Sequence, residues 1–293
     1  MRARLDSTSE PLQALAMNIW DVMTIPRDDL GRGARVRVRI AGDAEALMVE
    51  MARVMAAEVV EHTRQGRPTC LIVPVGPVGQ YRHLARLVQD EGLDLSGTTL
   101  IQMDEFLDES GALIDPQHPL SFRGFLDREF FATLPPERAP KPEQRVCPDP
   151  IAPDRIADRI REAGGVDVCF GGIGLNGHLA FNEPEPEASV DDFASRPTRV
   201  LDVAPASRAH MAVNLSCALA LIPTRAVTLG MNEILGARRV RIFANRSWQQ
   251  GIVRLAVHGP LSASCPASLL RLHEDTEIVI TDEVAQPVEV RLR

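Results

Sequence analysis

The sequence has no run of about 18 apolar residues that could cross a bilayer, and its first 20 residues hold no long apolar segment of the kind found in secretory signals. It also has no excess of basic residues, since 32 Lys and Arg stand against 40 Asp and Glu and the net charge is −8. Nucleic acids and anionic membranes attract clustered Lys and Arg. We therefore expect a cytoplasmic protein with no membrane or nucleic-acid partner.

Recognisable metal and nucleophile motifs are missing as well. The cysteines are odd in number, scattered and never spaced as C-x-x-C, so they predict neither a disulfide framework nor a zinc site. A Walker loop, an H-E-x-x-H helix and a G-x-S-x-G turn are all absent. The five cysteines are Cys70, Cys147, Cys169, Cys217 and Cys265.

What the chain does have is a repeated alternation of helical and strand-like segments. "EALMVEMARVMAAEVVEHTRQ" has apolar residues at helical spacing, and "TCLIVPVG" after it is a short apolar strand that ends in turn residues. The alternation continues through "TTLIQMDEF", interpreted as one strand, and "VDVCFGGIG", as far as "TEIVITDE". This pattern predicts an α/β fold of three layers, with a mostly parallel sheet flanked by helices on both faces.

The same pattern suggests how the 293 residues divide. We expect residues 37–293 to form a single α/β domain, because the alternation resumes unchanged after the Pro-rich stretch at 134–153, which we interpret as a surface connection. Residues 1–36 have no place in the alternation. They are predicted to be an N-terminal extension that packs on the domain or on another subunit, so a homo-oligomer is one expectation.

Three loops follow predicted strands and carry the candidate chemistry: "PVGPVGQY", "QMDEFLDESG" and "GGIGLNGHLAFNEP". Ligands bind beyond the carboxyl ends of strands in such sheets. Asp104 follows an apolar run and is placed to act as a base there, although a lone Asp after a strand more often caps the next turn. Glu105 is expected to point to the opposite face.

The third loop contains a histidine between polar neighbours. His178 has Asn176 two residues before it and Glu183 five residues after it, an arrangement that suits a proton shuttle whose tautomer is fixed by its neighbours. The alternative is a structural histidine that bonds within its own loop.

Four segments, in order, resemble the glucosamine-6-phosphate deaminase family, which is related to sugar-phosphate isomerases and 6-phosphogluconolactonases. They are "QMDEFLDESG", "DPQHPLSFRGFLDREFF", "GGIGLNGHLAFNEP" and "SCPASLLRLHEDTEIVITDEVA", and the resemblance covers about residues 37–290. It implies a modified Rossmann-type fold. The "GHLAFNEP" run differs from the G-H-T-A-S-L-F-P typical of the lactonases, which favours the deaminase and isomerase branch.

The resemblance also implies roles for individual residues. Asp104 corresponds to the family base that moves a proton between C2 and C1 of an open-chain amino sugar, and His178 with Glu183 to the pair that assists ring opening. Asn176 stands where many members have Asp, but some bacterial members have Asn, and Glu183 still supplies negative charge. No metal and no organic cofactor is implied, because proton transfer of this kind needs only side chains.

The sequence departs from the family where the sugar's 6-phosphate is held. The loop "PVGPVGQY" has no hydroxyl residue, no basic residue lies within 211–214, and Gln249 aligns with a family Lys. Either the substrate lacks a phosphate, or other arginines such as Arg82 rebuild an anion site; Trp248 would suit stacking on a neutral sugar face. The residues expected beside the sugar are Gly76, Pro77, Val78, Gly79, Gly172, Gly174, Gly177, Gln249, Arg208 and Arg246.

Three functions remain open at this point. The favoured one is an amino-sugar isomerase or deaminase with a remodelled phosphate site. The second is a lactonase-type hydrolase in which His178 activates water. The third is a catalytically idle sugar-binding or regulatory homologue that has kept the fold.

Overall fold

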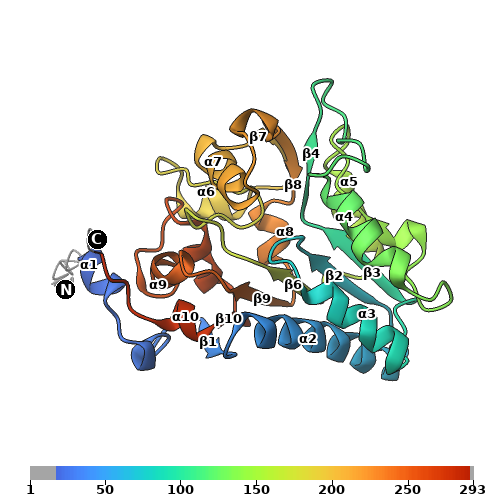
Figure 1. Ribbon diagram of the computed structural model, residues 1–293, viewed down its shortest axis with the longest axis horizontal. Helices are drawn as coiled ribbons and strands as arrows, with labels where there is room; N and C mark the ends of the chain where they lie inside the picture. Colours follow the sequence, from blue (N-terminus) through green and yellow to red (C-terminus); the bar gives the residue numbers. More distant parts are fainter. Residues whose placement is uncertain (1–17, 291–293) are drawn as a thin grey trace, which may run out of the picture.

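A parallel sheet of seven strands forms the centre of the computed structural model, which describes residues 18–290 (Figure 1). The strands lie in the order β1-β10-β9-β6-β2-β3-β5, and every neighbouring pair is parallel. Their bounds are β1 Arg37–Ile40, β2 Thr69–Val73, β3 Thr98–Gln102, β5 Arg145–Val146, β6 Val168–Gly171, β9 Arg239–Ala244 and β10 Thr276–Ile280.

Helices cover both faces of this sheet, so the predicted three-layer α/β fold is confirmed. Along β2, Leu71 and Val73 pack against α2, α3 and α4, whereas Cys70 and Ile72 pack into the core beneath α5, α6, α8, α9 and α10. Figure 1 shows α2 and α3 side by side along one face. These helices are α2 Ala44–Arg64, α3 Gln80–Asp90, α4 Phe122–Glu129, α5 Arg155–Glu162, α6 Val190–Ala194, α8 Met231–Leu235, α9 Gln249–His258 and α10 Asp282–Ala285.

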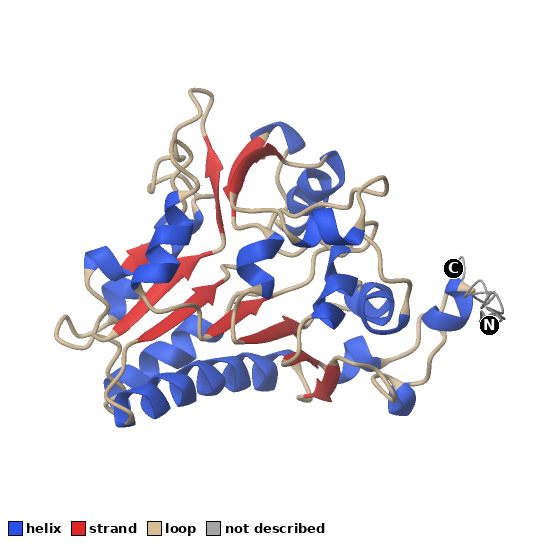
Figure 2. Ribbon diagram, turned by 180° about the vertical axis from the view of Figure 1, so that it is seen from behind, coloured by secondary structure: helices blue, strands red, loops and turns tan. Residues whose placement is uncertain are grey.

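A second, antiparallel sheet stands beyond the carboxyl ends of the main strands (Figure 2). It contains β4 (Asp104–Leu107), β8 (Arg225–Thr228) and β7 (Arg199–Asp202), and it shares a small apolar core with α7 (Pro205–Asn214). The prediction of one strand over "TTLIQMDEF" was therefore wrong. The chain leaves the main sheet at Met103 and enters the second sheet at Asp104, a change that the sequence does not reveal because no glycine or proline separates the two strands.

The buried carboxylate of Glu105 joins the second sheet to α4. Its side chain is fully buried, and it accepts hydrogen bonds from the backbone N–H groups of Phe122 (3.0 Å) and Arg123 (2.7 Å) and from the hydroxyl of Ser121 (2.9 Å). The N–H of Phe106 donates to the same carboxylate at 2.9 Å. A carboxylate satisfies the free N–H groups of a helix start and complements its positive dipole end.

Part of the predicted N-terminal extension is seen packed on the domain, and residues 1–17 lie outside the described residues. Helix α1 (Ile19–Met23) contacts α9, where the fully buried Arg254 donates to the carbonyl of Ile25 at 3.0 Å and to that of Ala285 at 2.7 Å. One side chain thus ties the chain's first described segment to its last helix. The boundary at residue 36 stays a prediction. No described helix is both long and apolar enough to cross a membrane.

We expect Glu105→Gln to lower the free energy of unfolding by about 2 kcal/mol or more, because an amide NH2 would face N–H donors that lose their acceptor. Chemical denaturation measured by circular dichroism checks this. The matched control is Glu109→Gln, which removes an exposed carboxylate from the loop after β4 and should leave stability within about 0.5 kcal/mol of wild type. Equal stability of both variants would contradict the role given to Glu105.

Candidate active site

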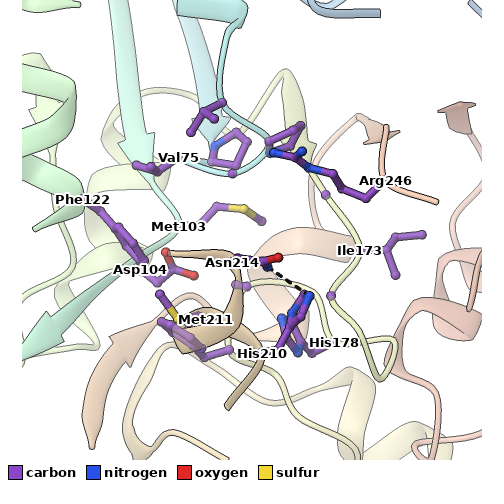
Figure 3. A pocket seen from close by; sticks show the side chains of 18 of the residues that line it. Val75, Met103, Asp104, Phe122, Ile173, His178, His210, Met211, Asn214 and Arg246 are labelled. Carbon is purple, nitrogen blue, oxygen red and sulfur yellow. Dashed lines mark hydrogen bonds between the residues drawn. The ribbon is translucent and has the colours of Figure 1, made fainter. Parts of the chain in front are cut away.

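A cavity of about 470 Å³ lies between the two sheets, at the carboxyl ends of the main strands (Figure 3). All three loops singled out in the sequence contribute to its wall. The lining residues from these loops are Pro74–Val78, Asp104, Gly172, Ile173, Gly174 and His178. Helix α7 and the loop between β9 and α9 supply the remaining polar groups. Asp104 and His178 lie on different walls of the cavity (Figure 3).

Asp104 is held at the point where β3 ends and β4 begins. The side-chain amide of Gln102 donates to its carbonyl oxygen at 2.5 Å, and none of the hydrogen bonds found in residues 18–290 reaches its carboxylate. Burial, together with the nearby charge of Glu105, raises the pKa of Asp104 to about 8. Because its carboxylate is poorly solvated, it becomes a strong base once it has lost its proton.

The imidazole of His178 is oriented by three polar side chains. Its Nδ1 lies 2.8 Å from Oδ1 of Asn176, 3.2 Å from the hydroxyl of Ser207 and 3.4 Å from Oε2 of Glu183. Oδ1 of Asn176 can only accept, so the neutral ring carries its proton on Nδ1. Nε2, which is then free of its proton, lies beside Gly174 on the cavity wall.

Asn176 connects the histidine to a buried carboxylate. Its Nδ2 donates to Oε2 of Glu183 at 2.7 Å, and neither residue lines the cavity itself. Burial acts to raise the pKa of Glu183. The hydrogen bond of His178 and its charge when protonated, with the hydrogen bonds of Ser207 and Asn176, outweigh burial and hold that pKa below its usual value. Glu183 therefore stays ionised and supplies the negative charge behind the ring that Asn176 does not.

The glycines of this loop are required by close packing. A Cβ on Gly174 would lie 2.0 Å from Nε2 of His178, and one on Gly177, whose φ is +87°, would lie 2.9 Å from Sγ of Cys265. Gly172 faces Pro77, 3.2 Å from where its Cβ would be. Among the predicted glycines, Gly172 and Gly174 line the cavity, whereas Gly177 lies behind it.

The loop after β2 offers a ligand few hydrogen-bond donors. Gly76, Pro77 and Val78 line the cavity as predicted, but Pro77 has no N–H and Val78 presents an apolar side chain. Gly79 precedes α3 with φ +125°, and a Cβ there would lie 3.0 Å from Met48. It does not line the cavity.

Of the three arginines considered for the sugar site, one lies at the cavity and two do not. Arg246 lines it, with no ion pair to any residue from 18 to 290. Arg208 does not, because its guanidinium turns away and donates to the carbonyl of Ile222 at 3.0 Å. Arg82 also lies elsewhere, paired with Glu45.

Gln249 lines the cavity, and its amide already makes hydrogen bonds within the protein. Oε1 accepts from the N–H groups of Asn245 and Arg246, both at 2.8 Å, and Nε2 donates to the carbonyl of Ile173 at 2.7 Å. These bonds hold two cavity loops together and leave one N–H of the amide without a partner among them. That Gln249 contacts the sugar stays a prediction.

Sequence reasoning placed residues 211–214 of α7 near the sugar's phosphate end but missed Ser207 and His210 of the same helix. This helix presents His210, Met211 and Asn214 to the cavity, and Ser207 to the back of His178. Asn214 Nδ2 lies 3.0 Å from His210 Nε2, and the imidazole meets the ring of Trp248 edge-on, with centroids 4.4 Å apart. Only the helical spacing of these residues could have signalled a shared face.

Charge at the cavity is low. Burial and the neighbouring His178 both lower the pKa of His210, so it is uncharged at neutral pH. Arg246 is then the one permanently cationic side chain among the described lining residues. No group of three His, Cys, Asp or Glu side chains within residues 18–290 is arranged to hold a metal ion.

Comparisons with known proteins agree with the sequence resemblance, although no protein-family model matches the chain. Over 261 residues it is 31% identical to a glucosamine-6-phosphate deaminase of Hahella chejuensis, covering 87% of this chain and 93% of that protein. A second relative with that name, from Shewanella loihica, is 34% identical over 71% of this chain and 74% of its own length.

Solved structures give the same result. A monomeric glucosamine-6-phosphate deaminase is similar with a TM-score of 0.73 and 27% identity, over 85% of this chain and 99% of that one. A 6-phosphogluconolactonase from Trypanosoma cruzi shares the fold, with a TM-score of 0.61 at 15% identity over 85% of this chain and 96% of that one. From its match along most of the Hahella chejuensis relative, this chain belongs to the glucosamine-6-phosphate deaminase family of enzymes.

Proposed function

We propose that the protein converts an amino sugar into a ketose with release of ammonia. The observation that carries this proposal is the pairing of a desolvated carboxyl, Asp104, with an oriented imidazole, His178, on two walls of one cavity. Two titratable groups in such different environments suit a reaction that needs both a base and a proton shuttle. The names of the relatives support the reaction class.

The two side chains divide the chemistry. His178 moves a proton from the anomeric hydroxyl to the ring oxygen, which opens the ring. Asp104 then takes the proton on C2, and the electrons of that bond form a C1=C2 double bond while the C1=O π electrons move to O1. O1 takes a proton from the neighbouring ammonium group of the substrate. Return of the proton to C1 leaves an iminium group at C2, which water hydrolyses to the ketone and ammonia. No cofactor takes part in these steps.

The other end of the sugar is held, in our proposal, without a phosphate. A dianion needs several cations or backbone N–H groups around it. The wall instead offers Pro77, Val78, the uncharged His210 and the single guanidinium of Arg246. His210 and Asn214 can exchange hydrogen bonds with a hydroxyl group, and the Trp248 ring suits the apolar face of a sugar.

The predictions on partners and location stay open. A small sugar is the proposed partner, and the segment before residue 37 remains a candidate for a homo-oligomer interface. A cytoplasmic location is the expectation from the sequence.

We expect Asp104→Asn to lower kcat by about 10²- to 10⁴-fold, because the variant cannot take the C2 proton. A base works only when ionised, so with a pKa of about 8 for Asp104 the wild-type kcat/KM should fall about tenfold per pH unit below that value. Ammonia release measured from pH 6 to 9 checks both statements. A flat profile, or full activity of the variant, would contradict the assignment; Glu109→Gln is the control.

Asn176→Ala should lower kcat at least about tenfold, because it removes the acceptor that orients Nδ1 of His178. Asn176→Asp keeps that oxygen and should lose less. Steady-state kinetics on the same amino sugar give both values. If the alanine variant matched wild type, orientation of the imidazole by Asn176 would be ruled out as a catalytic requirement.

Free glucosamine, or another amino sugar without phosphate, should be used with a kcat/KM at least about tenfold higher than glucosamine 6-phosphate. His210→Ala should raise KM for the preferred sugar more than it changes kcat, because the imidazole contacts the end that does not react. Ammonia release from the paired sugars tests this.

Preference for the phosphorylated sugar would refute the remodelled site, and lactone hydrolysis without ammonia release would favour the lactonase alternative. Failure to turn over any sugar would favour the idle homologue.

A further inference from the structure

A second cavity, of about 210 Å³, lies at the carboxyl ends of neighbouring strands. Val73, Gln102 and Val146, which line it, are the last residues of β2, β3 and β5. Helix α4 and the segment after β5 close its sides through Arg123 and Cys147. The carboxyl ends of parallel strands are the usual place for ligands in sheets of this kind. The proposed sugar chemistry uses none of these side chains.

Two arginines face this cavity without acidic partners. Among residues 18–290, no carboxylate lies within 4.0 Å of the guanidinium of Arg123 or of Arg145. Arg145 donates from Nε to the carbonyl of Pro140 at 2.9 Å and lies 4.4 Å over the ring of Phe131, so its position is fixed while its charge stays uncompensated.

Arg123 has an unsatisfied donor. Its Nη2 donates to the carbonyl of Ile114 at 3.3 Å, but its Nε is buried and has no hydrogen-bond partner. A buried donor on a charged group that lacks an acceptor is costly, so such a group indicates that something else supplies the acceptor. A guanidinium pair is suited to bind the oxygens of a phosphate or carboxylate group.

The rest of the wall adds little negative charge. Burial is the main cause that raises the pKa of the Cys147 thiol, and the charges of Glu105, Asp104 and Asp149, which lie behind the wall, add to it, so Cys147 stays neutral. Asp127 is the single acidic residue on the wall; it is exposed and lies beyond 4.0 Å from both guanidinium groups. The wall itself therefore carries two guanidinium groups and one carboxylate, whereas the larger cavity has a single permanent cation.

From this arrangement we propose that the second cavity is a binding site for a small oxyanion of the phosphate class, held by Arg123 and Arg145. The site is separate from the sugar cavity, because the two cavities share no lining residue. Gln102 bonds to the backbone of Asp104, and the backbone N–H of Arg123 bonds to Glu105. Gln102 and Arg123, which both line the second cavity, thus contact the segment that positions the proposed base.

Calorimetric titration of the full chain with inorganic phosphate tests this proposal without any need for turnover. We expect Arg145→Gln and Arg123→Gln each to weaken phosphate binding at least about tenfold, because each removes a charged donor. The matched control, Arg128→Gln, removes an exposed guanidinium from the same helix and should bind as wild type does. Thermal melting without phosphate verifies that each variant is folded.

Three results would overturn the site. One is the absence of phosphate binding by wild type, and another is unchanged binding in both cavity variants. The third is loss of binding in Arg246→Gln, with Arg123→Gln and Arg145→Gln unaffected, since that would place the anion in the sugar cavity. A parallel titration with acetate separates the two sources of oxyanion. Tighter Arg145-dependent binding of acetate than of phosphate would reject the phosphate class.

Discussion

The active-site geometry depends on the buried carboxylate of Glu105. It fixes the start of α4 against β4 through two helix N–H groups and the Ser121 hydroxyl. Side chains alternate along a strand, so anchoring Glu105 on one side turns Asp104 towards the other, into the cavity. The same carboxylate also contributes to the raised pKa of Asp104. A structural cap thus sets both the direction and the basicity of the proposed base.

Asp104 and His178 differ in the polar groups that surround them. The carboxyl of Asp104 gains no hydrogen bond from the described residues, so burial determines its behaviour. His178 has the opposite environment, with Asn176, Ser207 and Glu183 all near Nδ1. Asn176 accepts from the ring and donates to Glu183, a pairing that an aspartate could not make while ionised. With Asn176 in place of the aspartate of many family members, the negative charge near the imidazole comes from Glu183, and the orientation of the ring is preserved.

Much of this arrangement was predictable from the sequence. The remainder could not be predicted, and the reasons are physical. Alternating helices and strands predict one parallel sheet, and strand ends predict that three loops meet. The transfer of the chain between sheets at Met103 left no trace in the sequence, because no glycine or proline separates β3 from β4. His210 was missed since a histidine in a helical stretch carries no motif, and Arg208 was misplaced because carbonyl oxygens of its own neighbourhood satisfy its guanidinium. Tertiary contacts determine where the side chains of His210 and Arg208 lie.

The two cavities distribute positive charge unequally. The larger one holds the proposed chemistry but has one permanent cation, Arg246, at its exposed edge. The smaller one has two guanidinium groups without carboxylate partners. Moving a phosphate dianion out of water costs several kcal/mol for each uncompensated charge, so its position is governed by where cations lie. On that ground a free anion favours Arg123 and Arg145, whereas the larger cavity favours a sugar whose remote end is uncharged.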